Sequence, residues 1–145
     1  MLFRRKPTHL EFFLVHPGGP FWKNKDLGAW SIPKGEFTDE ENPLDAAVRE
    51  FEEETGQKIT GEFFALNPVK LKSGKTILAW AVEGDIDTNA ITSNTFEMEW
   101  PPKSGKIITV PEVDKGDWFN ADAAVQRINP AQAAFILEVQ QKTRR

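Results

Sequence analysis

Apolar residues along this chain come in short runs, and glycine, proline and polar residues separate one run from the next. The strongest run (LEFFLVH) stops at Pro17-Gly18-Gly19-Pro20, as expected of a buried strand that ends in a turn. A polar turn at residues 72–75 lies between two further runs and predicts a hairpin. The predicted strands are residues 10–16, 30–32, 62–69, 76–83, 96–100 and 118–119.

Helical stretches are predicted at residues 43–55, 121–127 and 131–142. The first is well delimited, because Asn42 is a good N-cap, Pro43 suits the first helical position and Gly56 suits the stop. At 100° per residue its apolar side chains share one face, which is expected to pack on a sheet: Leu44, Ala47, Val48 and Phe51. Strands flanked by helices predict an α/β protein, with a mixed sheet and helices packed on it.

The length and composition favour one globular domain spanning residues 1–145. The chain is 39% hydrophobic and 28% charged, without a linker or an internal repeat. The N-terminal residues lack the apolar stretch of a signal peptide, and no run approaches the roughly 20 apolar residues of a membrane span. We therefore expect a cytoplasmic protein without a membrane partner.

The charges are unevenly distributed. Eighteen basic against 22 acidic residues give a net charge of −4, which argues against a stable nucleic-acid partner. Nine of the acids lie between Glu36 and Glu54, where Arg49 is the only basic residue. With no cysteine, no tyrosine and only two histidines, carboxylates are the main reactive groups available.

Three of these acids cluster on one face of the first predicted helix. Glu50, Glu53 and Glu54 stand at spacing i, i+3, i+4, where like charges repel by a few tenths of a kcal/mol per pair. Clustered carboxylates are the ligands that hard divalent cations such as Mg²⁺ prefer. The alternative is a solvated acidic helix face.

Residues 35–56, GEFTDEENPLDAAVREFEEETG, resemble the Nudix box. All seven defining positions match, in order: Gly35, Glu41, Arg49, Glu50, Glu53, Glu54 and Gly56. The apolar Phe51 agrees as well, whereas Gln57 replaces a residue that is usually apolar in the family. The resemblance implies a Nudix fold, an α/β/α sandwich around a mixed sheet. It also implies hydrolysis of a nucleoside diphosphate derivative with Mg²⁺ or Mn²⁺.

The same resemblance implies a role for each residue of the motif. Glu50, Glu53 and Glu54 would bind metal, together with the carbonyl of Lys34 or Gly35. Glu53 is the expected general base, Arg49 would orient Glu50 and Glu53, and Glu41 would brace the loop against the helix. Nudix enzymes often add another acid from outside the motif, and three residues are candidates for it: Glu97, Glu99 and Glu112.

Substrate contacts are expected outside the motif. The segment WSIPKG (residues 30–35) resembles that of asymmetric dinucleoside tetraphosphate hydrolases, which places Lys34 near phosphate. His16, Trp22 and Trp30 flank it, and a purine could stack on an indole; the alternative is a place in the core. Lys103 and Lys106 are candidates for contacts with distal phosphates, unless they are simply solvated.

Three functions therefore compete. The first is hydrolysis of a dinucleoside polyphosphate, and the second is a nucleoside triphosphate pyrophosphatase of the MutT type. The third is a nucleotide-binding Nudix domain without turnover, or an acidic helix that docks a partner. The intact Glu50, Glu53, Glu54 and Arg49 argue against the third. The base, the phosphate count and the oligomeric state stay open at this point.

Overall fold

The structure of the chain, a computed structural model, describes residues 1–33 and 40–143. Its strands are β1 (Leu2–Arg5), β2 (Leu10–Pro17), β3 (Phe64–Ala65), β4 (Val69–Lys70), β5 (Thr76–Ile77), β6 (Trp80–Glu83), β7 (Thr95–Glu99), β8 (Ile107–Pro111) and β9 (Val113–Asn120). Its helices are α1 (Pro43–Thr55), α2 (Ala121–Arg127) and α3 (Ala133–Thr143), with short 3₁₀ turns η1 (Thr88–Ala90) and η2 (Pro130–Gln132). None of the described helices is long and apolar enough to cross a membrane.

The central sheet is mixed and has the strand order β3-β6-β1-β2-β9. β1 runs parallel to β6, and the other neighbours in this sheet are antiparallel. Successive side chains of β2 point to opposite faces, as a pleated strand requires. Phe12 and Leu14 enter one buried cluster, whereas Phe13 and Val15 enter the other. Both faces of the sheet are therefore apolar and need a cover.

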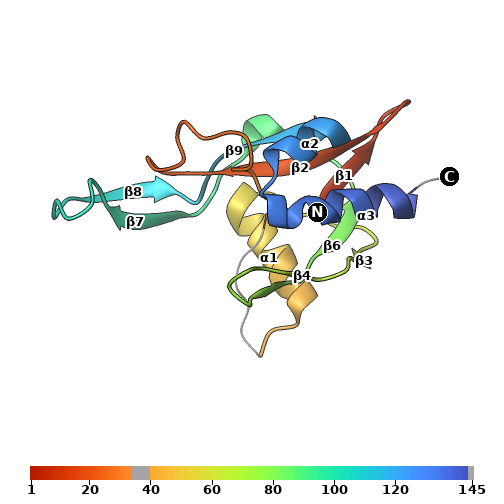
Figure 1. Cartoon of the computed structure of the whole chain (residues 1–145), viewed down its shortest axis with the longest axis horizontal. Helices are drawn as coiled ribbons and strands as arrows, with labels where there is room; N and C mark the ends of the chain where they lie inside the picture. The colour runs from red at the N-terminus through yellow and green to blue at the C-terminus, as the bar shows by residue number, and fades with distance from the viewer. Residues whose placement is uncertain (34–39, 144–145) are drawn as a thin grey trace.

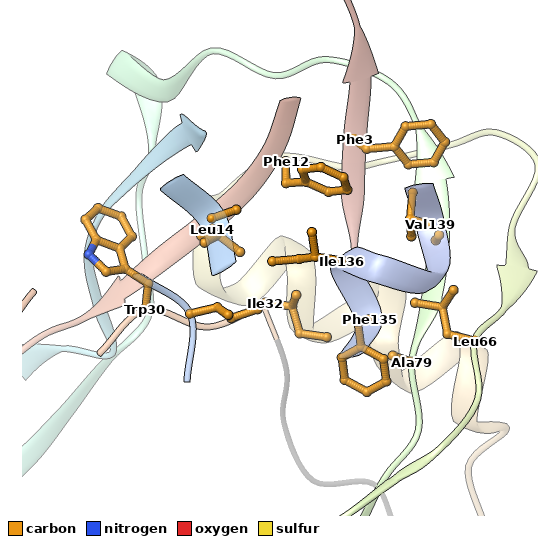
Figure 2. Close-up of a cluster of buried hydrophobic side chains, with 13 residues drawn as sticks. Phe3, Phe12, Leu14, Trp30, Ile32, Leu66, Ala79, Phe135, Ile136 and Val139 are labelled. Carbon is orange, nitrogen blue, oxygen red and sulfur yellow. The ribbon is translucent and has the colours of Figure 1, made fainter. Parts of the chain in front are cut away.

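Helices α2 and α3 cover one face of the sheet (Figure 1). Phe135, Ile136 and Val139 of α3 are fully buried in this cluster, and Figure 2 shows Ile136 beside Phe12 and Leu14 of β2. The buried cluster on this face is the larger of the two.

Helix α1 covers the other face. Phe51 packs against Phe13 with ring centroids 5.9 Å apart, and Trp118 of β9 meets Phe13 at 5.7 Å. Of the face predicted for this helix, Phe51 is buried, whereas its other three members are half-buried; Ala46 is buried in addition. The sheet lies between α1 and the α2/α3 pair, so the predicted α/β/α sandwich around a mixed sheet is confirmed.

Several predicted elements differ in extent. The hairpin across residues 72–75 exists but is interrupted, with β4 pairing β5 and β3 pairing β6. Residues 30–32 form only isolated bridges to Val15 and Ile128. The strand predicted at residues 118–119 is the end of the much longer β9, and β1 and β8 were not predicted. Pairing with distant segments, rather than local pattern, sets these boundaries.

Strands β7 and β8 form a separate two-stranded ribbon that projects from the body (Figure 1). Phe96 pairs with Val110 and Met98 with Ile108, so one face of the ribbon is apolar. Residues 100–106 connect the two strands at the tip.

Candidate active site

Helix α1 carries most of the carboxylates of the Nudix-like motif. Asn42 caps its start by accepting hydrogen bonds from N–H groups of the first turn. At the other end Gly56 adopts a positive φ of 75°, and its N–H donates to the Glu52 carbonyl at 2.7 Å. A left-handed C-cap is a conformation that glycine adopts at little cost. The helix thus begins and ends where the sequence predicts, and this sets which face its glutamates occupy.

Arg49 joins three carboxylates at the surface of α1. Its Nη1 donates to Glu50 at 3.0 Å and to Glu53 at 3.1 Å. Its Nε and Nη2 donate to the two oxygens of Glu41, each at 3.2 Å. Charge-assisted bonds of this kind hold a carboxylate in a defined orientation. The contacts that the resemblance implies for Arg49 and Glu41 are present, whereas their catalytic roles stay predictions.

The carboxyl group of Glu50 carries the clearest electrostatic signal in the cluster. Its pKa is raised, first by burial and then by the negative charges of Glu53 and Glu112, and Arg49 offsets this only in part. The Glu50 side chain is 13% exposed, against 35% for Glu53. Burial and the neighbouring acids together therefore outweigh the effect of Arg49 on Glu50.

Glu112 is the acid from outside the motif that the structure brings toward this cluster, since its charge acts on Glu50. Backbone hydrogen bonds hold it there. Asn94 N–H donates to the Glu53 carbonyl at 2.8 Å, Glu112 N–H donates to the Asn94 carbonyl at 2.8 Å, and Gly18 N–H donates to the Glu112 carbonyl at 3.0 Å. This series of backbone hydrogen bonds thus connects α1, the start of β9 and the end of β2.

Glu97 and Glu99, the other two candidates, lie on β7 of the ribbon. They pair there with Thr109 and Ile107 of β8, and a carboxylate oxygen of Glu99 accepts from the Lys103 N–H at the tip. Both are exposed, and the ribbon leads away from α1 (Figure 1). The structure therefore separates the three acids and favours Glu112.

The donors near α1 suit a hard divalent cation in their chemistry. Glu50, Glu53, Glu54 and Glu112 offer carboxylate oxygens, which are the ligands that such a cation prefers, and the negative charges of Glu53 and Glu112 add to burial in raising the pKa of Glu50. Within the described ranges, no three His, Cys, Asp or Glu side chains are gathered closely enough to hold an ion. Lys34 and Gly35, named for phosphate and metal contacts, lie outside the described residues.

His16 is placed inside the protein, with an exposed fraction of 1%. Its Nε2 lies 2.6 Å from the carbonyl oxygen of Lys25, and its Nδ1 lies 2.8 Å from the Asp114 carboxylate. Both ring nitrogens are thus engaged by the protein. His16 is therefore in position to hold the loop that contains Lys25, and a direct contact with substrate would require breaking one of these bonds.

Trp30 and Trp22, the two predicted stacking residues, have different surroundings. Trp30 is 4% exposed, donates from its indole N–H to Asp26 at 2.7 Å and meets Phe119 edge to face (Figure 2 shows it at the border of the core). Trp22 is 36% exposed and lies in the loop of residues 18–27, beside Phe21. The structure thus leaves Trp22 accessible to a ligand and places Trp30 in the core.

Lys103 and Lys106 lie at the tip of the β7–β8 ribbon and are exposed. Lys106 and Glu112 stand at the two ends of β8, six positions apart, which at about 3.3 Å per residue amounts to roughly 20 Å. The tip is therefore far from the carboxylates, and contact with distal phosphates there would require a long ligand.

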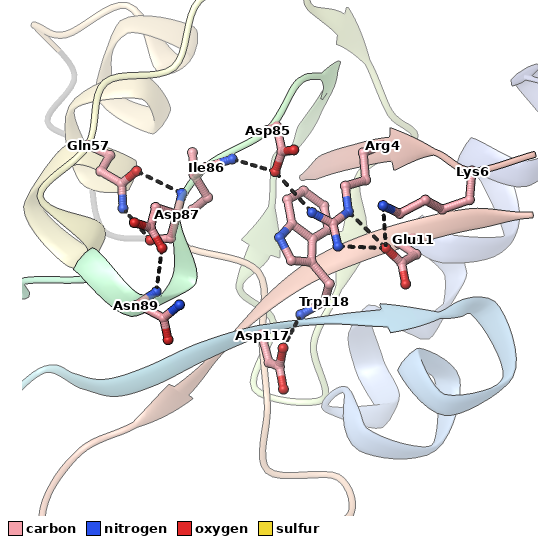
Figure 3. Close-up of polar contacts among 10 residues, drawn as sticks. All are labelled: Arg4, Lys6, Glu11, Gln57, Asp85, Ile86, Asp87, Asn89, Asp117 and Trp118. Carbon is pink, nitrogen blue, oxygen red and sulfur yellow. Dashed lines mark hydrogen bonds and ion pairs between the residues drawn. The ribbon is translucent and has the colours of Figure 1, made fainter.

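Sequence reasoning did not single out Asn94, Phe21 or Lys25. Asn94 acts through its backbone, for which the sequence carries no signal. Phe21 adjoins Trp22 in a loop rich in charged residues, and an aromatic pair in such a loop is a pattern that could have been noticed. Gln57, where the motif departs from the family, forms two hydrogen bonds through its side chain with the backbone of Asp87, the N-cap residue of η1 (Figure 3). The helix exit is therefore held by hydrogen bonds at this position.

Comparison with known families agrees with this fold. The model of the NUDIX domain family matches residues 2–139. The chain therefore belongs to the NUDIX domain family, and the class of protein predicted from the motif, a Nudix hydrolase domain, is confirmed.

Three relatives illustrate the family. The mRNA-decapping protein g5R of African swine fever virus (strain Badajoz 1971 Vero-adapted) is 50% identical over 120 residues, which cover 75% of this chain and 42% of the viral protein. A bis(5'-nucleosyl)-tetraphosphatase [asymmetrical] of Rattus norvegicus is 43% identical over 82 residues, 52% of each chain. A C. elegans Ap4A hydrolase in a binary complex has a TM-score of 0.66 at 15% identity, over 97% of this chain and 92% of that one.

The structural match shows the fold alone at this identity. The chain spans less than half the length of the viral relatives that it matches. The substrates of those proteins are therefore not assigned to this chain.

Proposed function

We propose that this chain hydrolyses a pyrophosphate bond in the phosphate bridge of a dinucleoside polyphosphate. The cluster centred on Arg49 carries the proposal, because its guanidinium joins Glu41, Glu50 and Glu53 beside α1, and Glu112 adds a further negative charge that acts on Glu50. An acidic face that served only as solvated surface would have no need of Glu112, which comes from a distant part of the chain. The Nudix family of the chain supports the same reaction class.

Each residue of the cluster has a defined task in this proposal. Glu53 accepts a proton from the attacking water, and Nη1 of Arg49 keeps its carboxylate in place at 3.1 Å. Glu41 fixes the opposite side of the guanidinium. Glu50, Glu54 and Glu112 would hold Mg²⁺ or Mn²⁺, with Glu53 as a further ligand. A bound divalent ion would neutralise pyrophosphate charge and lower the pKa of a water.

The preference for a dinucleoside substrate rests on two observations. The segment WSIPKG resembles that of asymmetric dinucleoside tetraphosphate hydrolases, and the rat relative carries that activity in its name. The exposed Trp22 in the loop after β2 offers an aromatic face for a second base. Nucleoside triphosphate hydrolysis of the MutT type is the alternative that a substrate screen must exclude.

Capped RNA is a second candidate substrate, favoured by the viral mRNA-decapping relatives. A cap is a nucleoside joined through phosphates to the 5′ end of RNA, so the scissile linkage is chemically similar to that of a dinucleoside polyphosphate. The exposed lysines at the ribbon tip, roughly 20 Å from Glu112, lie where only a long ligand could meet both. If capped RNA is the substrate, the sequence-based expectation of no nucleic-acid partner is wrong.

A substrate screen with Mg²⁺ tests the proposal. We would compare diadenosine tetraphosphate, ATP, dGTP and a short capped RNA at equal concentrations, and separate the products by ion-exchange chromatography. We expect the largest kcat/KM for diadenosine tetraphosphate, split into a mono- and a triphosphate. A preference for ATP or dGTP at every salt concentration would contradict the dinucleoside proposal, and a preference for capped RNA would select the second candidate.

Lys103 and Lys106 give this screen a second readout. If they contact a long substrate, Lys103→Ala and Lys106→Ala lower kcat/KM for that substrate more than for ATP, and added salt narrows the difference because exposed charges are screened over about 8–10 Å. An equal change of kcat/KM for all substrates would show that the two lysines do not determine substrate preference. The cytoplasmic location expected from the sequence stays a prediction.

A further inference from the structure

The loop of residues 18–27, which a backbone bond from Gly18 to Glu112 joins to the carboxylate cluster at its start, exposes an aromatic pair. Phe21 is 55% exposed and Trp22 36% exposed, and their rings meet edge to face with centroids 5.0 Å apart. The Nζ of Lys25 lies 3.6 Å from the centroid of Phe21 and 5.3 Å from that of Trp22. We propose that Phe21, Trp22 and Lys25, here called the aromatic platform, bind the base of the nucleoside that lies across the phosphate bridge from the cleaved bond. This inference rests on the proposed function.

The chemistry of the three side chains fits a nucleotide. Any base can stack on an exposed indole, because every base has a π-face. The ammonium of Lys25 lies over Phe21 at 3.6 Å and farther from Trp22, at 5.3 Å, so the larger indole ring is the surface that we assign to stacking. A base on that indole would have the Lys25 ammonium beside it, where a phosphate oxygen could accept a hydrogen bond. The platform thus combines a stacking surface with one positive charge.

The backbone ties the start of the platform loop to Glu112. Gly18 N–H donates to the carbonyl of Glu112, the acid whose charge reaches Glu50. Four peptide units separate Gly18 from Trp22, so their Cα atoms are at most about 15 Å apart. The hydrogen bond from Trp22 N–H to the Gly19 carbonyl, at 3.2 Å, folds the loop back and shortens this distance. A bridge of three or four phosphates with its ribose can span such a separation.

The far end of the loop is fixed by the buried His16. Because the Lys25 carbonyl can only accept, Nε2 of His16 carries a proton and donates to it at 2.6 Å. Asp114 holds the other side of the ring at 2.8 Å, and Trp30 packs edge to face on it at 5.1 Å. His16 is therefore a positioning residue: it sets where Lys25 and the aromatic pair stand without touching substrate.

The test compares two substrates that differ only in the second nucleoside. Diadenosine tetraphosphate has it, and adenosine 5′-tetraphosphate lacks it. For Trp22→Ala we expect KM for diadenosine tetraphosphate to rise by about 5- to 150-fold, the loss measured when a base loses its stacking partner. The rise for adenosine tetraphosphate should be at least tenfold smaller. Leu27→Ala, which removes another exposed apolar side chain of the same loop, is the matched control and should change neither substrate.

Equal changes for both substrates in Trp22→Ala would overturn the proposal, because the loop would then act without contacting the second base. If wild-type protein turns over neither substrate, the proposed function fails and the platform is tested by binding alone. Fluorescence titration of the Glu53→Gln variant with diadenosine tetraphosphate should then show quenching that Trp22→Ala removes. Absence of this difference would overturn the platform whatever the activity.

The positioning role of His16 has its own pair of variants. His16→Leu removes the donor to the Lys25 carbonyl, so KM for diadenosine tetraphosphate should rise while kcat stays within about twofold. His16→Gln can donate from its side-chain amide and should restore part of the wild-type KM. Circular dichroism confirms that both variants fold. A fall in kcat without a change in KM, or no rescue by glutamine, would contradict the positioning role.

Discussion

Two arginines in this chain each join carboxylates, but with different results. Arg49 is 41% exposed and bonds to Glu41, Glu50 and Glu53 around one helix. Arg4 is 25% exposed, pairs with Glu11 and Asp85, and lies 4.1 Å above the ring of Trp118 (Figure 3). The two networks use the same type of hydrogen bond.

The difference lies in the balance of charge and in the partners. Around Arg49 the acids outnumber the arginine, and the pKa of Glu50 is raised as a result of burial and of that excess. Around Arg4 the main acid, Glu11, also has Lys6 at 3.9 Å, and the guanidinium rests on an indole. Arg4 ties β1 to β2, β9 and the segment after β6. The comparison indicates that a surplus of acid, rather than the presence of an ion-pair network, marks the candidate active site.

The largest expected effect concerns the proposed general base. Glu53→Gln keeps the shape of the side chain but removes its charge and basicity, so kcat on the best substrate should fall by roughly 10²- to 10⁴-fold. Asp85→Asn, which changes an acid of the Arg4 network in the same way, should leave kcat within about twofold. Turnover assays on both variants, after circular dichroism has confirmed their fold, measure this. Near wild-type kcat in Glu53→Gln would remove Glu53 from its role and favour Glu50 or Glu112.

The next effect is stabilisation by metal. An ion that binds only the folded protein at 100 times its dissociation constant adds about 2.7 kcal/mol to the free energy of unfolding. The Tm of wild-type protein should therefore rise with Mg²⁺ or Mn²⁺, and should rise much less in a Glu50/Glu53/Glu54→Gln triple variant. Arg4→Ala should keep the full shift. If wild type and the triple variant gained the same Tm, the ion would not be bound at these glutamates.

A smaller effect concerns the stability that the Arg4 network adds to the fold. Arg4→Ala loses a cation–π contact and two partly exposed ion pairs, and should lower the free energy of unfolding by about 1–2 kcal/mol. Arg5→Ala is the control, because Arg5 pairs with Glu83 at 3.0 Å; its loss should stay below about 1 kcal/mol. Urea denaturation of both variants gives the comparison. Equal losses would mean that the stack on Trp118 adds nothing.

Local signals account for what the sequence predicted well. Helix α1 is bounded by its own cap residues, Asn42 and Gly56, and the cluster of Arg49 with its glutamates follows from spacing along one helix. β1 was missed because two of its four residues are arginines, and its burial arises only when β2 and β6 pair with it. For β8 the apolar, β-branched run Ile107–Val110 is a usable strand signal in the sequence.

The candidate site also combines contacts that the sequence predicts with contacts that it does not. Glu112 could not be chosen over Glu97 and Glu99 from sequence, because its place depends on backbone bonds through Asn94 and Gly18. The burial of His16 likewise depends on partners 9 and 98 residues away. Contacts within one helix can be predicted from spacing, whereas contacts made when the sheet assembles cannot.

The smallest expected effect is a change of stability with pH. Because burial, and then Glu53 and Glu112, raise the pKa of Glu50 in the folded protein, the folded state binds a proton more readily than the unfolded chain. In metal-free protein the contribution of Glu50 to the free energy of unfolding should therefore become more stabilising as pH falls through the raised pKa, and should be lost above that pKa. Asp26 acts in the opposite direction, since the hydrogen bond from Trp30 lowers its pKa. The difference in free energy of unfolding between wild type and Glu50→Gln, measured by urea denaturation from pH 4 to pH 8 in the presence of a chelator, isolates Glu50. We expect wild type to gain relative to the variant as pH falls; a difference that is independent of pH would show that burial and the neighbouring acids do not raise the pKa of Glu50.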